Sequence, residues 1–204
     1  YERGMYVEEI NTNGYFLRQE VLDQMKERGI RPLMKISFDG IGHHDWLRGR
    51  KGAEEDAIRA IRLCRANDFP VMIQTNVHRH NLDTLLETAK LMDSLGVWKM
   101  RIIRTSEAPR WKENAGDAAL GLTEYYDRML EFASAYMKTG CRMDVIIWQF
   151  LRLYPVSGSY GMIPVLYREK EYRYHHVTEV DEYIKFAGTP EKLVREPEEV
   201  VRRA

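Results

Sequence analysis

Cysteine is scarce in this sequence, and its only two cysteines, Cys64 and Cys141, lie far apart. A disulfide framework needs an even set of cysteines at short spacings, and a thiolate-bound metal needs at least a closely spaced pair, so we expect neither. Cys64 falls on the apolar side of a predicted helix, where apolar residues recur every three or four positions, and we expect a buried core thiol. We expect no chemistry of Cys141.

Net charge is missing as well, because 31 basic residues balance 31 acidic residues. A neutral chain lacks the attraction that drives non-specific binding to nucleic acids and anionic membranes, so neither partner is expected. No apolar run approaches the roughly 18 residues of a membrane span, and the amino-terminal stretch has no signal-peptide pattern. We therefore expect a cytoplasmic protein. Because the sequence begins with Tyr1 rather than methionine, we expect it to be a piece of a longer protein.

The sequence also lacks the short signatures of several common sites. It has no GxGxxG after a strand and no GxxxxGK[ST], which disfavours nucleotide-phosphate binding. It has no Gly-x-Ser-x-Gly elbow and no Cys-His arrangement, which disfavours nucleophilic catalysis.

Strand-like and helix-like stretches alternate along the chain. Short runs rich in Ile, Val and Met are followed by amphipathic stretches of three or four turns, which is the pattern of βαβ units with a parallel sheet. Strands are expected at Met5–Thr12, Leu33–Phe38, Phe69–Val77 and Val97–Ile103, with a fifth at Arg142–Phe150. We expect an α/β fold, either part of a (β/α) barrel or an open doubly wound sheet, in three parts: a core over 1–105, a helix and last strand over 106–150, and an α-rich, irregular extension over 151–204.

Polar residues gather where the second predicted strand ends. Ser37, Asp39 and Gly40 follow an apolar run directly. Parallel α/β proteins bind ligands outside the carboxyl ends of their strands, so a hydroxyl, a carboxylate and a glycine there fit a small-molecule site. An ordinary Asp-Gly turn with a solvated loop after it explains the same residues.

Other titratable side chains follow strand ends. His43, His44 and Asp45 fit a metal or acid–base site, although adjacent histidines rarely bind one metal ion together. His78 and His80 are expected in a solvated loop. Three arginines could each hold a carboxylate through two hydrogen bonds, with surface ion pairs as the alternative: Arg48, Arg101 and Arg104.

Five short motifs stand at or near strand ends in the first half of the chain. They are Thr12-Asn13-Gly14, Ile36-Ser37-Phe38-Asp39-Gly40, His44-Asp45-Trp46-Leu47-Arg48-Gly49, Ile73-Gln74-Thr75-Asn76-Val77 with Asn81-Leu82, and Leu95-Gly96-Val97. Their order and spacing over about residues 5–105 resemble the core of radical S-adenosylmethionine (radical SAM) enzymes. The likeness is greatest to the branch that matures peptides and sulfatases and that often carries a SPASM-type extension.

The resemblance implies a partial (β/α)6 TIM-like barrel, of which this chain supplies roughly the third to sixth strands. It implies that S-adenosylmethionine lies at the strand ends, with Ser37 and Asp39 near its methionine and ribose parts and Arg48 beside its carboxylate. The other side chains that it would bring to the same cavity are Asn13, Gln74 and Asn76.

In such an enzyme a [4Fe–4S] cluster cleaves S-adenosylmethionine, and the resulting 5′-deoxyadenosyl radical abstracts hydrogen from a substrate. The partners implied are a peptide or protein substrate and an electron donor for the cluster. The family's CxxxCxxC loop, its Gly-Gly-Glu-type motif and the SPASM-type cysteines do not occur in this sequence. Because three thiolates must hold such a cluster, we expect its ligands upstream and this chain alone to be inactive.

Two other functions stay open. A barrel remnant without a cluster could bind a ligand or a peptide and catalyse nothing. A lyase or hydrolase without a cluster could use Asp39, His43 and His44, with zinc or manganese as its metal.

Overall fold

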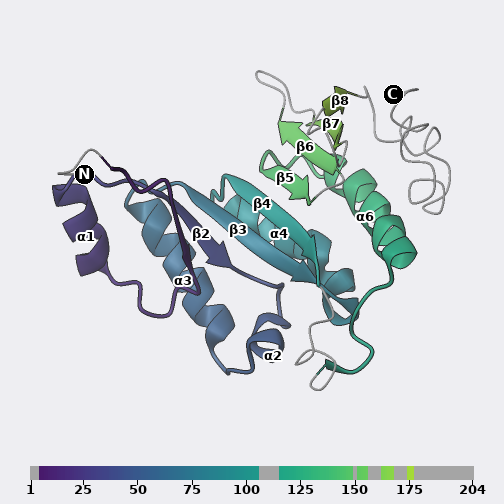
Figure 1. Ribbon diagram of the computed structural model, residues 1–204, viewed down its shortest axis with the longest axis horizontal. Helices are drawn as coiled ribbons and strands as arrows, with labels where there is room; N and C mark the ends of the chain where they lie inside the picture. The colour runs from purple at the N-terminus through teal and green to yellow at the C-terminus, as the bar shows by residue number, and fades with distance from the viewer. Residues whose placement is uncertain (1–4, 106–114, 149–150, 156–161, 168–173, 177–204) are drawn as a thin grey trace.

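The chain folds around one sheet whose strands lie side by side in sequence order (Figure 1). The computed structural model describes residues 5–105, 115–148, 151–155, 162–167 and 174–176. Within these residues the sheet has eight strands, β1 to β8.

The first five strands are parallel, and a helix connects each of them to the next. The strands are β1 (Glu9–Thr12), β2 (Leu33–Ser37), β3 (Val71–Val77), β4 (Lys99–Arg104) and β5 (Asp144–Ile147). The main connecting helices are α1 (Gln19–Glu27), α3 (Ala53–Ala66), α4 (Leu85–Ser94) and α6 (Leu122–Met137). This alternation confirms the predicted βαβ units, whose crossover helices make parallel pairing possible.

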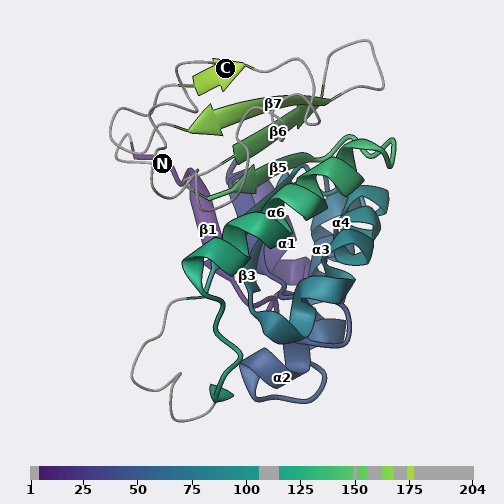
Figure 2. The same cartoon turned by 90° about the vertical axis from the view of Figure 1, so that its right-hand side faces the viewer.

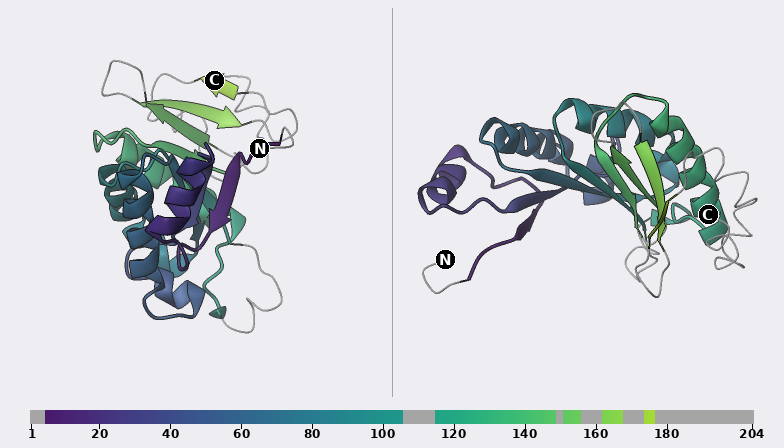
Figure 3. Two further views of the ribbon diagram at one scale, coloured as in Figure 1. Left: turned by 90° about the vertical axis from the view of Figure 1, so that its left-hand side faces the viewer. Right: turned by 90° about the horizontal axis from the view of Figure 1, so that it is seen from above.

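Among the described residues, the helices cover one face of the parallel strands, and no helix covers the other face. Seen from above, the helices form the outer layer of an arc and the strands form the inner layer (Figure 3, right). Side chains alternate along β2, so that Met34 and Ile36 are buried toward the helices while Lys35 and Ser37 lie on the inner face. Helix α3 contributes Ala57, together with other fully buried residues, to the core between the two layers. Helix α4 packs against α6 (Figure 2).

Two short elements follow strand ends. Helix α2 (His44–Arg48) stands between β2 and α3, and the 3-10 helix η1 (Arg79–Thr84) stands between β3 and α4. Both therefore lie at the carboxyl edge of the parallel strands, where ligands bind in folds of this kind.

The last three strands are antiparallel and correct one expectation. They are β6 (Leu151–Pro155), β7 (Met162–Tyr167) and β8 (Tyr174–His176), and each pairs with the strand before it. The described residues beyond 150 thus form strands rather than the expected α-rich extension, because Leu151 and Leu153 are buried on one side with a period of two. Pro164, a residue type that usually interrupts a strand, lies within β7, where it stands opposite Leu153 of β6.

The predicted division into residues 1–105, 106–150 and 151–204 stays a prediction. The sequence of the extension over 151–204 predicts two short helices that begin at prolines, at 189–191 and 196–199, and both lie outside the described residues. None of the helices in the described part of the chain has the length and apolarity that crossing a membrane requires.

Candidate functional site

A row of polar side chains crosses the inner face of the sheet. In the strand register Ser37 of β2 lies beside Gln74 of β3, and Gln74 lies beside Arg101 of β4. The next inner position of β3, two residues further along, is Asn76, whose side chain is partly buried. The structure therefore brings three of the predicted site residues, Ser37, Gln74 and Asn76, to one side of two neighbouring strands.

Asp39 follows β2 and is fully buried, with both of its carboxylate oxygens occupied. One oxygen accepts hydrogen bonds from the backbone N–H of Asn76 at 3.0 Å and from its side-chain amide at 3.1 Å. The other lies 2.9 Å from Nδ1 of His44 and accepts bonds from Nε and a terminal nitrogen of Arg48 at 2.8 and 2.7 Å. Asp39 thus ties helix α2 to the ends of β2 and β3.

The environment of Asp39 keeps this side chain ionised. Burial alone would raise its pKa, but the hydrogen bond with His44, the charge of Arg48 and the N–H of Asn76 outweigh burial and hold the pKa below its usual value. The sequence analysis identified Asp39 and Arg48 as ligand-binding candidates, and the structure pairs them with each other.

Asn81 of η1 is a residue of this edge whose role the sequence did not reveal. Its side-chain amide donates to the carbonyl oxygens of Asp39 and of Asn76, the latter at 2.9 Å, and its oxygen accepts the N–H of His78 at 3.0 Å. The sequence indicates Asn81 only as part of the motif that follows β3. The bonds to Asp39 and Asn76 show that it joins the loops after β2 and β3.

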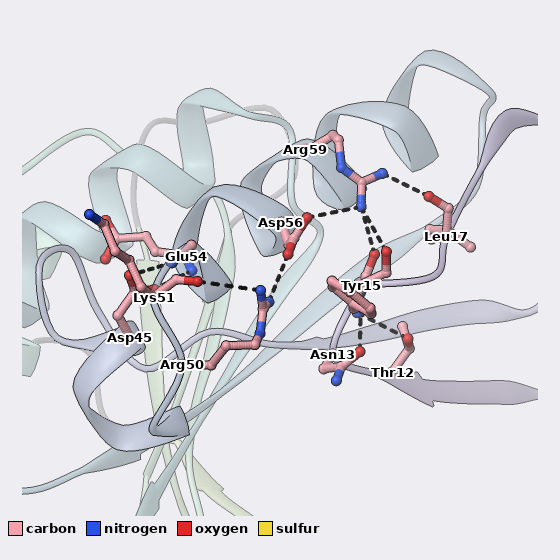
Figure 4. Close-up of polar contacts among 12 residues, drawn as sticks. Thr12, Asn13, Tyr15, Leu17, Asp45, Arg50, Lys51, Glu54, Asp56 and Arg59 are labelled. Carbon is pink, nitrogen blue, oxygen red and sulfur yellow. Dashed lines mark hydrogen bonds and ion pairs between the residues drawn. The ribbon is translucent and has the colours of Figure 1, made fainter.

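Asn13 lies in the loop after β1, and no contact among the described residues joins its side chain to Asp39 or its partners. Its side-chain oxygen accepts the N–H of Tyr15 at 3.1 Å, which makes a local turn. Arg59 of α3 holds this loop by donating to the carbonyl oxygens of Gly14 at 3.0 Å, Tyr15 at 3.2 Å and Leu17 at 2.7 Å (Figure 4). The position of Asn13 is therefore set by a helix behind the sheet.

The loop between α2 and α3 is tied to the same region. Arg50 pairs with Asp56 at 2.7 Å, and its guanidinium lies 4.7 Å from the ring centre of Tyr15. Asp45 accepts the N–H groups of Gly52 and Glu54 at 2.7 and 2.8 Å and so caps the start of α3 (Figure 4). The hydrolytic hypothesis relied on Asp39, His43 and His44, but the structure pairs His44 with Asp39, and the neighbouring Asp45 is occupied as a cap.

An aromatic cluster stands beside this loop. The ring of Trp46, which is 42% exposed, lies 4.9 Å from the ring of His78 and 4.5 Å from that of His80, measured between centres. His78 is fully buried rather than solvated, and the rings of Trp46 and His80 lie against its ring. Burial, with smaller contributions from His80 and His43, lowers the pKa of His78 to about 4, so the ring is neutral at pH 7.

We expect His78 to make the fold sensitive to mild acid. Its pKa is lower in the folded chain than the value of 6.5 of a free imidazole. The contribution of the neutral His78 ring to the free energy of unfolding is therefore fully present above about pH 6.5. It declines as the pH falls toward 4, by on the order of 2–3 kcal/mol. Urea denaturation of the wild type and of His78→Phe and His78→Gln between pH 7 and 4 measures this. Both variants should show a flatter dependence, and an unchanged dependence in both would refute the assignment.

The residues present do not fit an iron–sulfur cluster. Cys64 is buried within α3, where burial raises the pKa of its thiol to about 11. Cys141 is 77 positions further along the chain and follows α6. Within the described ranges no three histidine, cysteine or acidic side chains are grouped so that they could hold a metal ion. The polar row on the inner face does fit an organic cofactor, because it offers hydroxyl and amide groups of both donor and acceptor type at the strand ends.

Comparison with known proteins gives a sequence similarity for the first part of the chain. Residues 6–92 match the Radical SAM superfamily. The chain is 36% identical over 87 residues to the AdoMet-dependent heme synthase of Methanosarcina barkeri, which covers 42% of this chain and 25% of that protein. It is 26% identical over 139 residues to the sporulation killing factor maturation protein SkfB of Bacillus subtilis, which covers 68% of this chain and 33% of that protein. The chain thus spans about a quarter to a third of the length of these curated relatives.

The fold is also similar to that of a solved structure, native anSMEcpe with bound AdoMet. The TM-score is 0.54, with 12% identity, over 71% of this chain and 41% of that chain. At this identity the similarity concerns the fold alone, and it confirms the predicted partial TIM-like barrel. The SPASM-type branch stays a prediction. Residues 6–92, which carry all but the last of the five motifs, are thus the part of this chain that is similar to the radical SAM superfamily.

Proposed function

We propose that this chain forms the S-adenosylmethionine-binding part of a radical SAM enzyme. The observation that carries the proposal is the row of Ser37, Gln74 and Asn76 on the inner face of β2 and β3, inside the segment that matches the superfamily. Hydroxyl and amide groups at the carboxyl ends of parallel strands are suited to a cofactor that has an amine, a carboxylate and ribose hydroxyls.

In this proposal the predicted residues act in two ways. Asn13, Ser37, Gln74 and Asn76 would bind the cofactor directly. Arg48 would bind its carboxylate, because Asp39 uses only the Nε and one terminal nitrogen of a guanidinium that carries five N–H donors. Asp39 would then orient Arg48 rather than touch the cofactor.

The proposed enzyme needs groups that the described residues do not provide. When S-adenosylmethionine is bound and reductively cleaved, it supplies the radical that abstracts hydrogen from a substrate. The [4Fe–4S] cluster and its electron donor would be held elsewhere, since the described side chains do not group as its ligands. The part of this chain is to bind and orient the cofactor and to exclude water from it.

A peptide substrate is part of the proposal. SkfB is by its name a maturation protein of a killing factor, and one anSMEcpe structure contains a bound Kp18Cys peptide, with a TM-score of 0.52 to this chain and 14% identity. These are properties of those proteins. They support a peptide for this one more than a small metabolite, while the heme synthases among its relatives keep a tetrapyrrole as the alternative.

The first test is cofactor binding by the purified chain. S-adenosylmethionine should bind in isothermal titration calorimetry. Ser37→Ala and Gln74→Ala should each raise the dissociation constant about tenfold, because each loses a hydrogen bond to the cofactor. Gln24→Ala, on the exposed side of α1, is the control and should bind as the wild type does. Absence of binding by a folded wild-type chain, or equal losses in all three variants, would contradict the proposal.

A further inference from the structure

A group of basic side chains lies on the inner face of the last parallel strands. Lys99 and Arg101 are alternate residues of β4, and Arg152 of β6 lies beside Ile146, the β5 neighbour of Arg101. One carboxylate, that of Asp144 on β5, stands among them. In the described residues of this face, three cations thus surround one anion.

Asp144 is already saturated by two of the three cations. Arg152 binds it with two nitrogens, with Nε at 3.0 and 3.2 Å from the two carboxylate oxygens. Lys99 lies 3.6 Å from one of these oxygens. Asp144 and Arg152 are mostly buried, with exposed side-chain fractions of 5% and 18%, so this pair is fixed in place.

Arg101 is the cation without an anion. Its guanidinium packs over the ring of Trp148, with 4.6 Å from the central carbon to the ring centre. Its Nε is buried and has no hydrogen-bond partner, and no described carboxylate pairs with it. A buried N–H donor without an acceptor destabilises a fold. A bound ligand that accepts a hydrogen bond from Nε of Arg101 would remove this cost.

The electrostatics of the group agree with an empty anion position. The pKa of Lys99 is lowered, first by burial and then by Arg152 and Arg101, against the opposing effect of Asp144. Arg101 and Arg152 are therefore close enough to act on Lys99 unfavourably. An added anion would offset the excess of positive charge.

The geometry points to a binding position for a carboxylate or phosphate group of a small molecule at Arg101, on the inner face of β4. Trp148 holds the plane of the guanidinium, and a guanidinium offers two parallel N–H groups that match the two oxygens of such an anion. Arg101 lies in the same row as Ser37 and Gln74, next to the proposed cofactor site. The assignment of this anion to the substrate rests on the proposed function. The existence of the anion-binding position at Arg101 does not depend on that function.

The side-chain Nε–H resonances of the 15N-labelled chain provide the test. Sodium acetate and sodium phosphate are titrated separately at an ionic strength held constant with sodium chloride. We expect at least one of them to move the Arg101 resonance saturably, with a midpoint on the order of 1–10 mM. Arg101→Lys, which keeps the charge but loses the paired N–H groups, should weaken the binding at least tenfold, whereas Arg62→Lys on the exposed side of α3 should not.

The outcomes separate this inference from the proposed function. If neither anion shifts Arg101 in the folded wild-type chain, the inference is wrong, whatever S-adenosylmethionine does. If an anion binds but S-adenosylmethionine displaces it, the position belongs to the cofactor's own carboxylate and the assignment to a substrate fails. Binding that persists with S-adenosylmethionine present supports a substrate anion. Should Arg101→Lys not fold, Trp148→Leu is the second variant, and unchanged binding by it would count against the site.

Discussion

Replacing Asp39 by alanine is expected to destabilise the chain by about 3–5 kcal/mol, the usual cost of removing one partner from a buried ion pair. The substitution removes the acceptor of the Arg48 guanidinium and the carboxylate oxygen that contacts Nδ1 of the buried His44, and it removes two bonds to Asn76. Urea denaturation at pH 7 measures the loss. The matched control is Asp23→Ala, because Asp23 pairs with Lys26 at 3.4 Å on the surface and should cost well under about 1 kcal/mol.

The contribution of Asp39 should also depend on pH with a defined sign. Its folded pKa lies below the ordinary value of 3.8, so the unfolded chain takes up its proton first as the pH falls. The stabilisation is therefore complete above about pH 4 and is lost below it, as the pH passes through the folded pKa. The difference between wild type and Asp39→Asn should shrink over that range. A difference that stays constant down to pH 3 would show that the charge of Asp39 is not what stabilises this edge.

Replacing Gly14 by alanine is expected to cost roughly 2–4 kcal/mol and to disturb the loop that carries Asn13. The φ angle of Gly14 is +78°, which costs an alanine about 1–2 kcal/mol. An added Cβ would also lie 2.7 Å from the Cβ of Ala60, so α3 or the loop must move, at a further cost of about 1–3 kcal/mol. Denaturation gives the free energy, and calorimetry with S-adenosylmethionine shows whether the loop position matters for binding.

Gly29 offers an almost ideal comparison for Gly14. Its φ is +66°, and no atom lies within 4 Å of the position of an added Cβ. Gly29→Ala therefore carries the backbone cost without the contact with α3, and the difference between the two variants isolates that contact. Equal losses of unfolding free energy in the two variants would show that the contact between the added Cβ and α3 costs nothing. We expect only the Gly14 variant to weaken cofactor binding.

The parallel half of the fold could be predicted because each element has its own periodic signal. The apolar run of β3 and the recurrence of apolar residues every three or four positions in α3 are local patterns, which can be recognised in a short stretch of sequence. The structure has a strand and a helix in these stretches. Helix α2 has only five residues, too few to show a helical period, and it was missed. The strands from Leu151 onward were not predicted, because the glycines and prolines of this segment favour an irregular structure, whereas β6 follows the alternation of a strand.

The candidate site could be predicted only in part. Parallel topology brings strand ends together, so Ser37, Gln74 and Asn76 were correctly expected at one edge. No spacing rule reveals that Asp39 bonds Asn76, which is 37 positions away, or that the amide of Asn81 reaches back to the carbonyl of Asp39. A carboxylate at a strand end looks the same in sequence whether it binds a ligand or joins two loops.

The order of the strands has a consequence for how the protein is made. From β1 to β8, every strand pairs with the strand that precedes it along the chain, and no later segment is inserted between two earlier ones. Each strand can therefore add to a template that has already left the ribosome, without waiting for a distant partner. Because pairing always extends one edge, assembly has a direction, from the amino-terminal strands toward the antiparallel end.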